Sequence, residues 1–213
     1  MTSSPSESPQ LRAPWYFRKR FTVFGLMYGL SFPLGFLISG VTGMPPMSAY
    51  ASTGHPLIFG AIALSAAVGG YAVRVWASSY LAASIVWQQD VQLSTLRSSG
   101  PYRFTRNPLY LGNLLQALGM GLFGTWAVLA LLLTSMLIFT YALIRAEESF
   151  LSWQGGSAYE QYCAAVARLM PLPWKIAPAR GQRGELRDGL RSELGTAGVA
   201  AAAIMAMFLT WPR

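Results

Sequence analysis

Three long stretches of the chain contain no charged residue, and this feature constrains the fold more than any other. Asp, Glu, Lys and Arg are absent from residues 21–73, 107–144 and 194–212. A helix needs about 20 apolar residues to cross a hydrocarbon core about 30 Å thick. Only 11% of the 213 residues are charged, against about 25% in soluble domains. The sequence therefore predicts an all-α, multi-pass integral-membrane protein.

Glycines and prolines divide these stretches into about five predicted transmembrane helices. Their expected ranges are 21–40, 56–73, 108–120, 125–144 and 194–211. The third has about 13 residues, or roughly 20 Å of helix, and is expected either to reach only partway across or to tilt little and start in the headgroup layer. The fourth is expected to continue as a helix to Trp153 and to stop at Gly155 and Gly156. Gly25 and Gly29 form a GxxxG pair that predicts close packing, with the last helix as the expected partner.

The positive charges predict the orientation of the chain in the membrane. Four Lys or Arg residues precede the first predicted span, and none lie between the first and second spans. Four more fall in residues 74–106 and seven in residues 145–191. Because positive residues remain on the cytoplasmic side, the N-terminus and both polar segments are expected to be cytoplasmic.

Composition also limits the partners and ligands of the chain. The net charge is +8, but the basic residues flank apolar spans, so an anionic membrane surface is a better partner than nucleic acid. The single cysteine, Cys163, excludes an intramolecular disulfide, and without a Cys/His cluster no metal site is expected. We interpret Cys163 as a small helix-packing residue.

The first polar segment with residues suited to binding or catalysis is GPYRFTRNPLYLGN, residues 100–113. Its two prolines restrict the backbone and predict a rigid turn that holds Arg103, Arg106 and Asn107 just before a helix beginning at Pro108. Such a helix N-terminus attracts anions. On composition alone, a turn whose arginines contact lipid phosphates explains the segment equally well.

The second segment contains two adjacent carboxylates, Glu147 and Glu148, at the end of the fourth predicted span. Carboxylates at a membrane helix are costly unless they face water, a cation or a partner. The simplest structural explanation is an ion pair between Arg145 and Glu148, three residues apart on one helix.

Together the two segments resemble a known family. The first follows the pattern GPYR-x-x-RHP-x-Y-x-G except at Asn107, and the second contains EE-x-x-L and is followed by Y-x-x-Y and R-x-x-P. Arg74 and Trp76 fit an R-x-W-A element at the end of the second span. This combination resembles the isoprenylcysteine carboxyl methyltransferases and the related phospholipid N-methyltransferases, over residues 69–171.

The resemblance implies a membrane enzyme that binds S-adenosylmethionine (AdoMet) without a Rossmann domain, and the chain has no strand–GxGxxG–helix unit. The implied domain covers residues 15–176, between a disordered tail at 1–14 and a basic linker with a last helix at 177–213. The family's cofactor-binding elements map onto Tyr102, Arg106, Asn107, Tyr110, Leu111, Gly112, Glu147 and Glu148. A carboxylate would pair with the ammonium group of AdoMet, and an arginine with its carboxylate.

One residue departs from the family pattern, because Asn107 stands where the family has histidine. An amide can donate a hydrogen bond but does not titrate near neutral pH, so it is not expected to carry a proton.

Arg145 and Glu148 are the expected catalytic residues, with Glu148 as the base if the acceptor must lose a proton. Arg74, Trp76 and Arg145 are the expected substrate-binding residues.

The function that this pattern favours is methyl transfer from AdoMet to a lipidic or membrane-presented acceptor, such as an isoprenylcysteine carboxylate. Three alternatives remain at this point. They are phospholipid N-methylation, NADPH-dependent reduction of the kind that sterol reductases perform, and a non-catalytic membrane protein with the same fold.

Overall fold

The structure of the protein is a computed structural model that describes residues 14–45, 56–81, 99–179 and 183–210. Over these ranges it is helical apart from turns and one isolated bridge between Thr105 and Ala167. The elements are α1 (Trp15–Arg18), α2 (Arg20–Thr42), α4 (Pro56–Ser78), the 3₁₀ helix η1 (Gly100–Arg103), α6 (Pro108–Leu122), α7 (Trp126–Ala165), α8 (Leu186–Ser192) and α9 (Leu194–Thr210).

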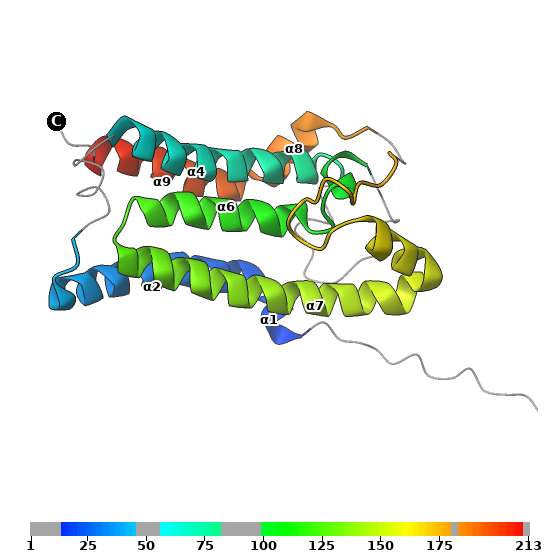
Figure 1. The fold of residues 1–213 in the computed structure, drawn as a ribbon, viewed down its shortest axis with the longest axis horizontal. Helices are drawn as coiled ribbons and strands as arrows, with labels where there is room; N and C mark the ends of the chain where they lie inside the picture. Colours follow the sequence, from blue (N-terminus) through cyan, green and yellow to red (C-terminus); the bar gives the residue numbers. More distant parts are fainter. Residues whose placement is uncertain (1–13, 46–55, 82–98, 180–182, 211–213) are drawn as a thin grey trace, which may run out of the picture.

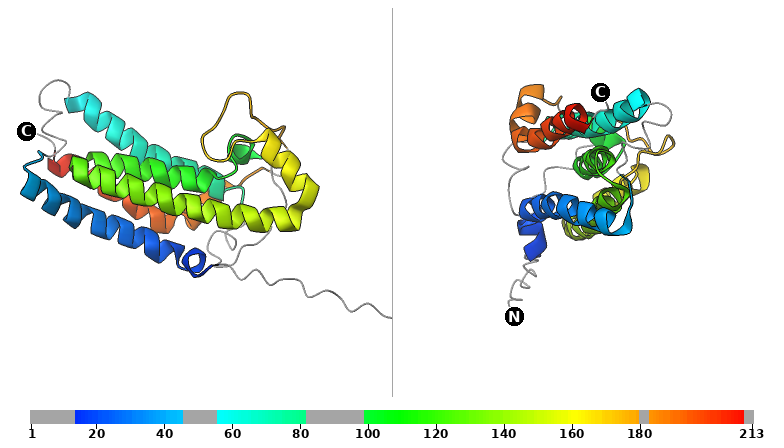
Figure 2. Two further views of the ribbon diagram at one scale, coloured as in Figure 1. Left: turned by 60° about the horizontal axis from the view of Figure 1, so that its bottom comes forward. Right: turned by 90° about the vertical axis from the view of Figure 1, so that its left-hand side faces the viewer.

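The long helices run side by side along one direction of the molecule (Figures 1 and 2). Helix α4 packs against α6, α6 packs against α7, and α7 packs against α2, while α9 lies against α4 and α6. The turns and short elements that follow α4 and α7 gather at one end of this bundle (Figure 1). The all-α fold class predicted from the sequence is therefore confirmed.

Three of the described helices are long and apolar enough to cross a membrane. They cover Arg20–Thr42, Ile58–Ser78 and Trp126–Trp153. Helix α6 has 15 residues and α9 has 17, so both are shorter than a typical span of about 20 residues. The short third helix was expected, whereas the total of five spans stays a prediction.

One predicted helix end differs from the structure, and another agrees with it. Helix α4 continues to Ser78 instead of ending near residue 73, so Arg74 and Trp76 are helical. The predicted stop at the glycine pair is present as a break, because Gly156 adopts the non-helical angles φ 50° and ψ −139°, and the two helical segments that share the label α7 meet there in a kink. Glycine reaches such a positive φ without a Cβ clash, so it can interrupt the helix at this position. The predicted tail at 1–14 and the loop at 41–55 lie largely outside the described residues.

Glycines allow α4 and α6 to approach closely. A Cβ atom added at Gly119 would lie 2.4 Å from the backbone nitrogen of Ala67 and 2.5 Å from the carbonyl oxygen of Ala63. Gly70 and Gly112 are similarly close to the backbone of the opposite helix. In a membrane, such small residues let backbones pack where lipid offers no hydrophobic driving force.

The prediction that Gly25 and Gly29 pack against the last helix is wrong. A Cβ atom at either position would meet nothing within 4 Å, and α9 lies against α4 and α6. Both glycines are on the exposed face of α2, while Gly35 of the same helix faces Val128 of α7. The spacing of two glycines does not reveal which face of a helix is covered.

We expect Gly119→Val to lower the free energy of unfolding by about 1–3 kcal/mol or more, because the new side chain would collide with backbone atoms. Gly29→Val is the matched control, since it makes the same change of residue on an open helix face. Thermal unfolding of both variants in detergent measures the difference. Equal melting temperatures would contradict the close α4–α6 packing.

Candidate functional site

The residues after η1 are held in place by a segment far along the chain. Arg106 N donates to the carbonyl of Ala167 at 2.9 Å, and Ala177 N donates to the carbonyl of Arg103 at 3.1 Å. The Arg103 side chain returns a bond from Nε to the carbonyl of Ala177 at 2.9 Å. The predicted rigid turn before Pro108 is therefore present, and residues 166–177 brace it.

Glu148 lies between two arginines at the centre of this region. Arg106 Nη2 is 2.9 Å from Glu148 Oε1, and Arg168 Nη2 is 2.9 Å from Glu148 Oε2. The Arg106 and Glu148 side chains are only 9% and 12% exposed, so both charges are largely shielded from water. This pairing neutralises a carboxylate at the end of a membrane helix.

The expected ion pair between Arg145 and Glu148 is wrong. Arg145 is exposed and its guanidinium lies over the ring of Tyr141, 5.8 Å from the ring centroid. Arg106 and Arg168 take the two Glu148 oxygens instead, and Arg145 lies back along the helix over Tyr141. The structure does not bring Arg145 together with the other predicted site residues.

Glu147 joins the site from another side. The phenol of Tyr110, in the first turn of α6, and the charge of Arg20 from α2 both act on the Glu147 carboxylate. Tyr110 is itself buried. Three helices thus meet around Glu147.

Asn107 is a buried donor that fixes the backbone of its neighbours. Its Nδ2 donates to the carbonyl of Arg168 at 2.8 Å, while its backbone N–H donates to Thr105 Oγ1 at 3.2 Å. The amide therefore supports the same segment that carries Arg168. This geometry agrees with a positioning role for the residue that replaces the family's histidine.

Two tyrosines of the site have raised pKa values. Tyr162, after the bend in α7, donates its hydroxyl to the carbonyl of Tyr102 at 2.8 Å. Burial raises the pKa of the Tyr162 phenol above its usual value. Burial, and then the charge of Glu147, raises the pKa of Tyr102. Neither phenol is therefore expected to ionise near neutral pH.

Arg74 and Trp76, predicted together as substrate-binding residues, are directed apart. Arg74 is buried and bound by Glu193 of the C-terminal segment, at 2.7 Å. Trp76 is half-exposed, and its ring centroid lies 6.1 Å from that of Phe104, in the residues just after η1. Leu111 and Gly112 are buried in α6, and a Cβ at Gly112 would lie 2.5 Å from Arg74 Cγ.

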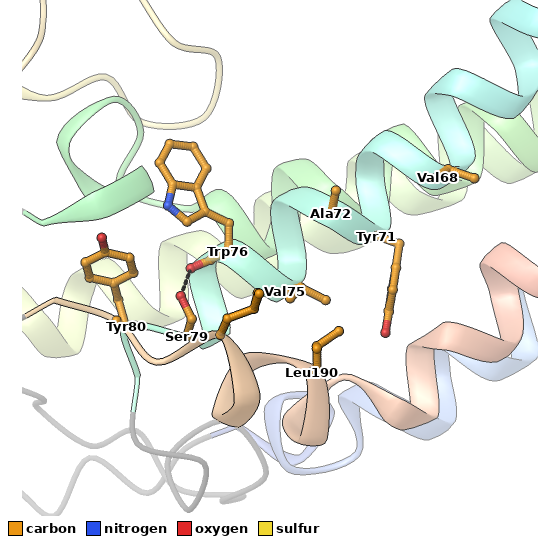
Figure 3. Close-up of a pocket in the computed structure, with 10 residues that line it drawn as sticks. Val68, Tyr71, Ala72, Val75, Trp76, Ser79, Tyr80 and Leu190 are labelled. Atoms are coloured by element: carbon orange, nitrogen blue, oxygen red, sulfur yellow. Dashed lines mark hydrogen bonds between the residues drawn. The ribbon is translucent and has the colours of Figure 1, made fainter.

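Trp76 lines an apolar groove between α4 and α8, with a volume of about 430 Å³. Figure 3 shows Trp76, Val75 and Leu190 along it, with Ser79 donating to the carbonyl of Trp76 at 2.8 Å. Leu186 and Val68 contribute further apolar surface. The groove begins beside a candidate membrane span and ends near the turn that precedes α6.

Sequence reasoning missed three residues of this region. Arg168 begins the R-x-x-P element, so the family pattern already contained a signal for it. Arg20 was counted only as a charge beside a span, and Glu193 gave no signal beyond being an acid just before an apolar helix. In the described ranges, no three His, Cys, Asp or Glu side chains are grouped as a metal site requires.

Two buried polar atoms in the site have no hydrogen-bond partner among the described residues. They are Arg106 Nε and Glu148 Oε1, the latter facing Arg106 as an ion pair without hydrogen-bond geometry. A buried donor or acceptor without a partner is costly. A ligand carrying both a carboxylate and an ammonium group, as AdoMet does, would satisfy both atoms, so the residues present fit this cofactor.

The sequence model of a family described as phospholipid methyltransferase matches residues 55–154. The matched segment, just under half of the chain, is similar to this family. It includes α4, α6 and the part of α7 that carries both glutamates, so the family segment supplies Arg106, Tyr110, Glu147 and Glu148. The resemblance found in the motifs is confirmed. Arg168 and Glu193 lie beyond the phospholipid methyltransferase segment.

One curated relative is the cobalt-zinc-cadmium resistance protein CzcN of Cupriavidus metallidurans. It is 34% identical over 127 residues, which cover 59% of this chain and 52% of the relative. The matched region thus spans about half the length of that protein. No solved structure matches the chain significantly.

We expect Glu148→Gln to destabilise the protein by about 3–5 kcal/mol, because it leaves the buried Arg106 guanidinium without its counter-charge. Arg145→Gln is the control on the same helix, and its exposed side chain should change stability by no more than about 0.5 kcal/mol. Equilibrium unfolding in denaturant and detergent measures both values. A Glu148→Gln variant as stable as the control would show that the pair does not hold these segments together.

Proposed function

We propose that the protein is an AdoMet-dependent methyltransferase of the membrane, acting on a lipidic acceptor. One observation carries the proposal. Arg106 Nε and Glu148 Oε1 are a buried donor and a buried acceptor without hydrogen-bond partners in the described part of the chain, side by side in the family's own motif residues. A donor beside an acceptor is complementary to the carboxylate and the ammonium group at the amino acid end of AdoMet.

The residues around this pair have distinct roles in the proposal. Arg106 binds the cofactor carboxylate, Glu147 and Glu148 face its ammonium group, and Asn107 and Tyr102 keep the surrounding backbone in place. Leu111 and Tyr110 offer apolar and aromatic surface for the adenosine part. When bound, AdoMet supplies a methyl group on a positively charged sulfur. The protein aligns the acceptor with that sulfur and excludes water.

The acceptor that fits best is a carboxylate on an apolar chain, such as an isoprenylcysteine. A carboxylate is already ionised, so it becomes a methyl ester without giving a proton to a base. In this proposal Glu148, the nearest candidate base, binds the ammonium group of the cofactor between Arg106 and Arg168, so it is not free to take a proton from the acceptor. The groove beside Trp76 matches an apolar chain.

In the proposed orientation, the site lies on the cytoplasmic side of a multi-pass membrane protein. The supporting observation is the distribution of Lys and Arg, because 15 of the 16 lie in the segments assigned to that side. AdoMet, a charged cytoplasmic metabolite, would then reach the site without crossing the membrane.

We expect Arg106→Lys to weaken AdoMet binding by about 1.5–3 kcal/mol, the usual worth of a hydrogen bond to a charged group. Lysine keeps the charge beside Glu148 but lacks the Nε donor. Arg145→Lys, a matched change at an exposed position, should bind AdoMet like wild type. Calorimetry in detergent measures both affinities.

Sealed vesicles of both orientations, incubated with methyl-labelled AdoMet, should incorporate label only where the cytoplasmic face is outside.

Other results would replace the proposal with one of its rivals. Binding of NADPH instead of AdoMet would indicate a reductase. Label in an amino headgroup would indicate phospholipid N-methylation. A folded wild-type protein that binds neither cofactor would be a non-catalytic relative.

We expect Ala72→Trp, which fills the groove, to raise the KM for N-acetyl-farnesylcysteine at least tenfold while leaving the Kd for AdoMet unchanged. Ala61→Trp is the control, since Ala61 is exposed on the same helix but outside the groove. Steady-state rates in detergent micelles provide both KM values. An unchanged KM in the Ala72→Trp variant would exclude the groove as the acceptor site.

A further inference from the structure

Glu193 is a fully buried carboxylate whose two oxygens are both occupied. Arg74 Nε donates to Oε2 at 2.7 Å, and Arg74 Nη2 donates to Oε1 at 3.1 Å. Ser78 Oγ donates to Oε1 at 2.6 Å, and Thr196 Oγ1 donates to Oε2. None of the Glu193 surface is exposed. The contact is a two-pronged, charge-assisted pair, the strongest kind of hydrogen bond in proteins.

The same arginine extends this contact to the beginning of α6. Arg74 Nη1 donates to Asn113 Oδ1 at 2.6 Å and to the carbonyl of Leu109 at 3.3 Å. These two residues are on either side of Tyr110, whose phenol acts on the Glu147 carboxylate. Gly112 leaves room for the arginine, since a Cβ there would lie 2.5 Å from Arg74 Cγ.

The energetics of such a pair point to a role other than stability alone. Removing two charges from water costs several kcal/mol each, and apolar residues of similar volume often replace a buried ion pair without loss of stability. What apolar residues cannot reproduce is the directional contact with Leu109 and Asn113. All three nitrogens of the Arg74 guanidinium are occupied in this way.

We propose that Glu193 is a positioning residue of the cofactor site, acting through Arg74 on the first turns of α6. The proposal rests on the proposed function. It changes the expected role of Arg74 from acceptor binding to positioning. It also makes Leu186–Thr210, which lies outside the phospholipid methyltransferase segment, a necessary part of the site.

The experiment compares wild type with the double variant Arg74→Met/Glu193→Met, which removes the pair but retains apolar volume. We expect the melting temperature to change by only a few degrees and the Kd for AdoMet to rise at least tenfold. We also expect backbone amides in residues 109–116 to exchange hydrogen at least tenfold faster in the ligand-free protein, with no change in residues 128–136.

Ser39→Ala is the control variant, which should reduce stability without affecting the position of α6. It removes the buried hydrogen bond from Ser39 Oγ to Thr125 Oγ1, 2.7 Å long, which joins α2 to the start of α7. This variant should lower the melting temperature but leave AdoMet binding and the exchange of residues 109–116 unchanged.

Each outcome decides the proposal. Wild-type affinity and wild-type exchange in the folded double variant would overturn it. If wild type itself binds no AdoMet, the proposed function fails, and the exchange of residues 109–116 alone decides whether Glu193 positions α6. If the double variant does not fold, Glu193→Asp is compared instead. Faster exchange there at a wild-type melting temperature supports the proposal, and unchanged exchange overturns it.

Discussion

The pairing of Glu148 with two arginines is the interaction on which the site depends. It joins α7 to the segment before α6 through Arg106, and to the segment after α7 through Arg168. The carboxylate stands at the end of a candidate membrane span, where an isolated charge would be unfavourable. Neutralising it therefore requires that the two loop segments come together. The same neutralisation brings the family's motif residues into one place.

Much of this arrangement could be predicted from the sequence because the signals were long or rigid. The uncharged stretches required membrane helices, and Pro108 marked the first residue of α6. The partner of Glu148 could not be predicted in the same way. Arg145 was the nearest cation on the helix, but the rotation of α7 about its axis depends on packing with α2 and α6. A pair i, i+3 on a helix shows that contact is possible, not that it occurs.

The glycines and Glu193 both show that the sequence does not reveal which helices become neighbours. Gly25 and Gly29 had the more familiar packing motif, whereas Gly70, Gly112 and Gly119 make the close contacts. In the sequence, Glu193 is an ordinary acidic residue just before an apolar helix, yet its side chain is among the most buried. In both cases the missing information is which helix becomes the neighbour, and that depends on contacts distant in the sequence.

Helix α4 separates the two halves of the proposed reaction. Arg74 and Trp76 are two residues apart, so on a helix of 3.6 residues per turn they point in nearly opposite directions. Arg74 faces the polar network with α6 and Glu193, and Trp76 faces the apolar groove. An acceptor in the groove would thus be separated from the cofactor residues by the body of the helix. The two sides approach each other near the end of α4, where Trp76 contacts Phe104 beside the motif turn. The methyl transfer that we propose must therefore occur at this end of the bundle, with the apolar chain extending back along α4 toward the membrane.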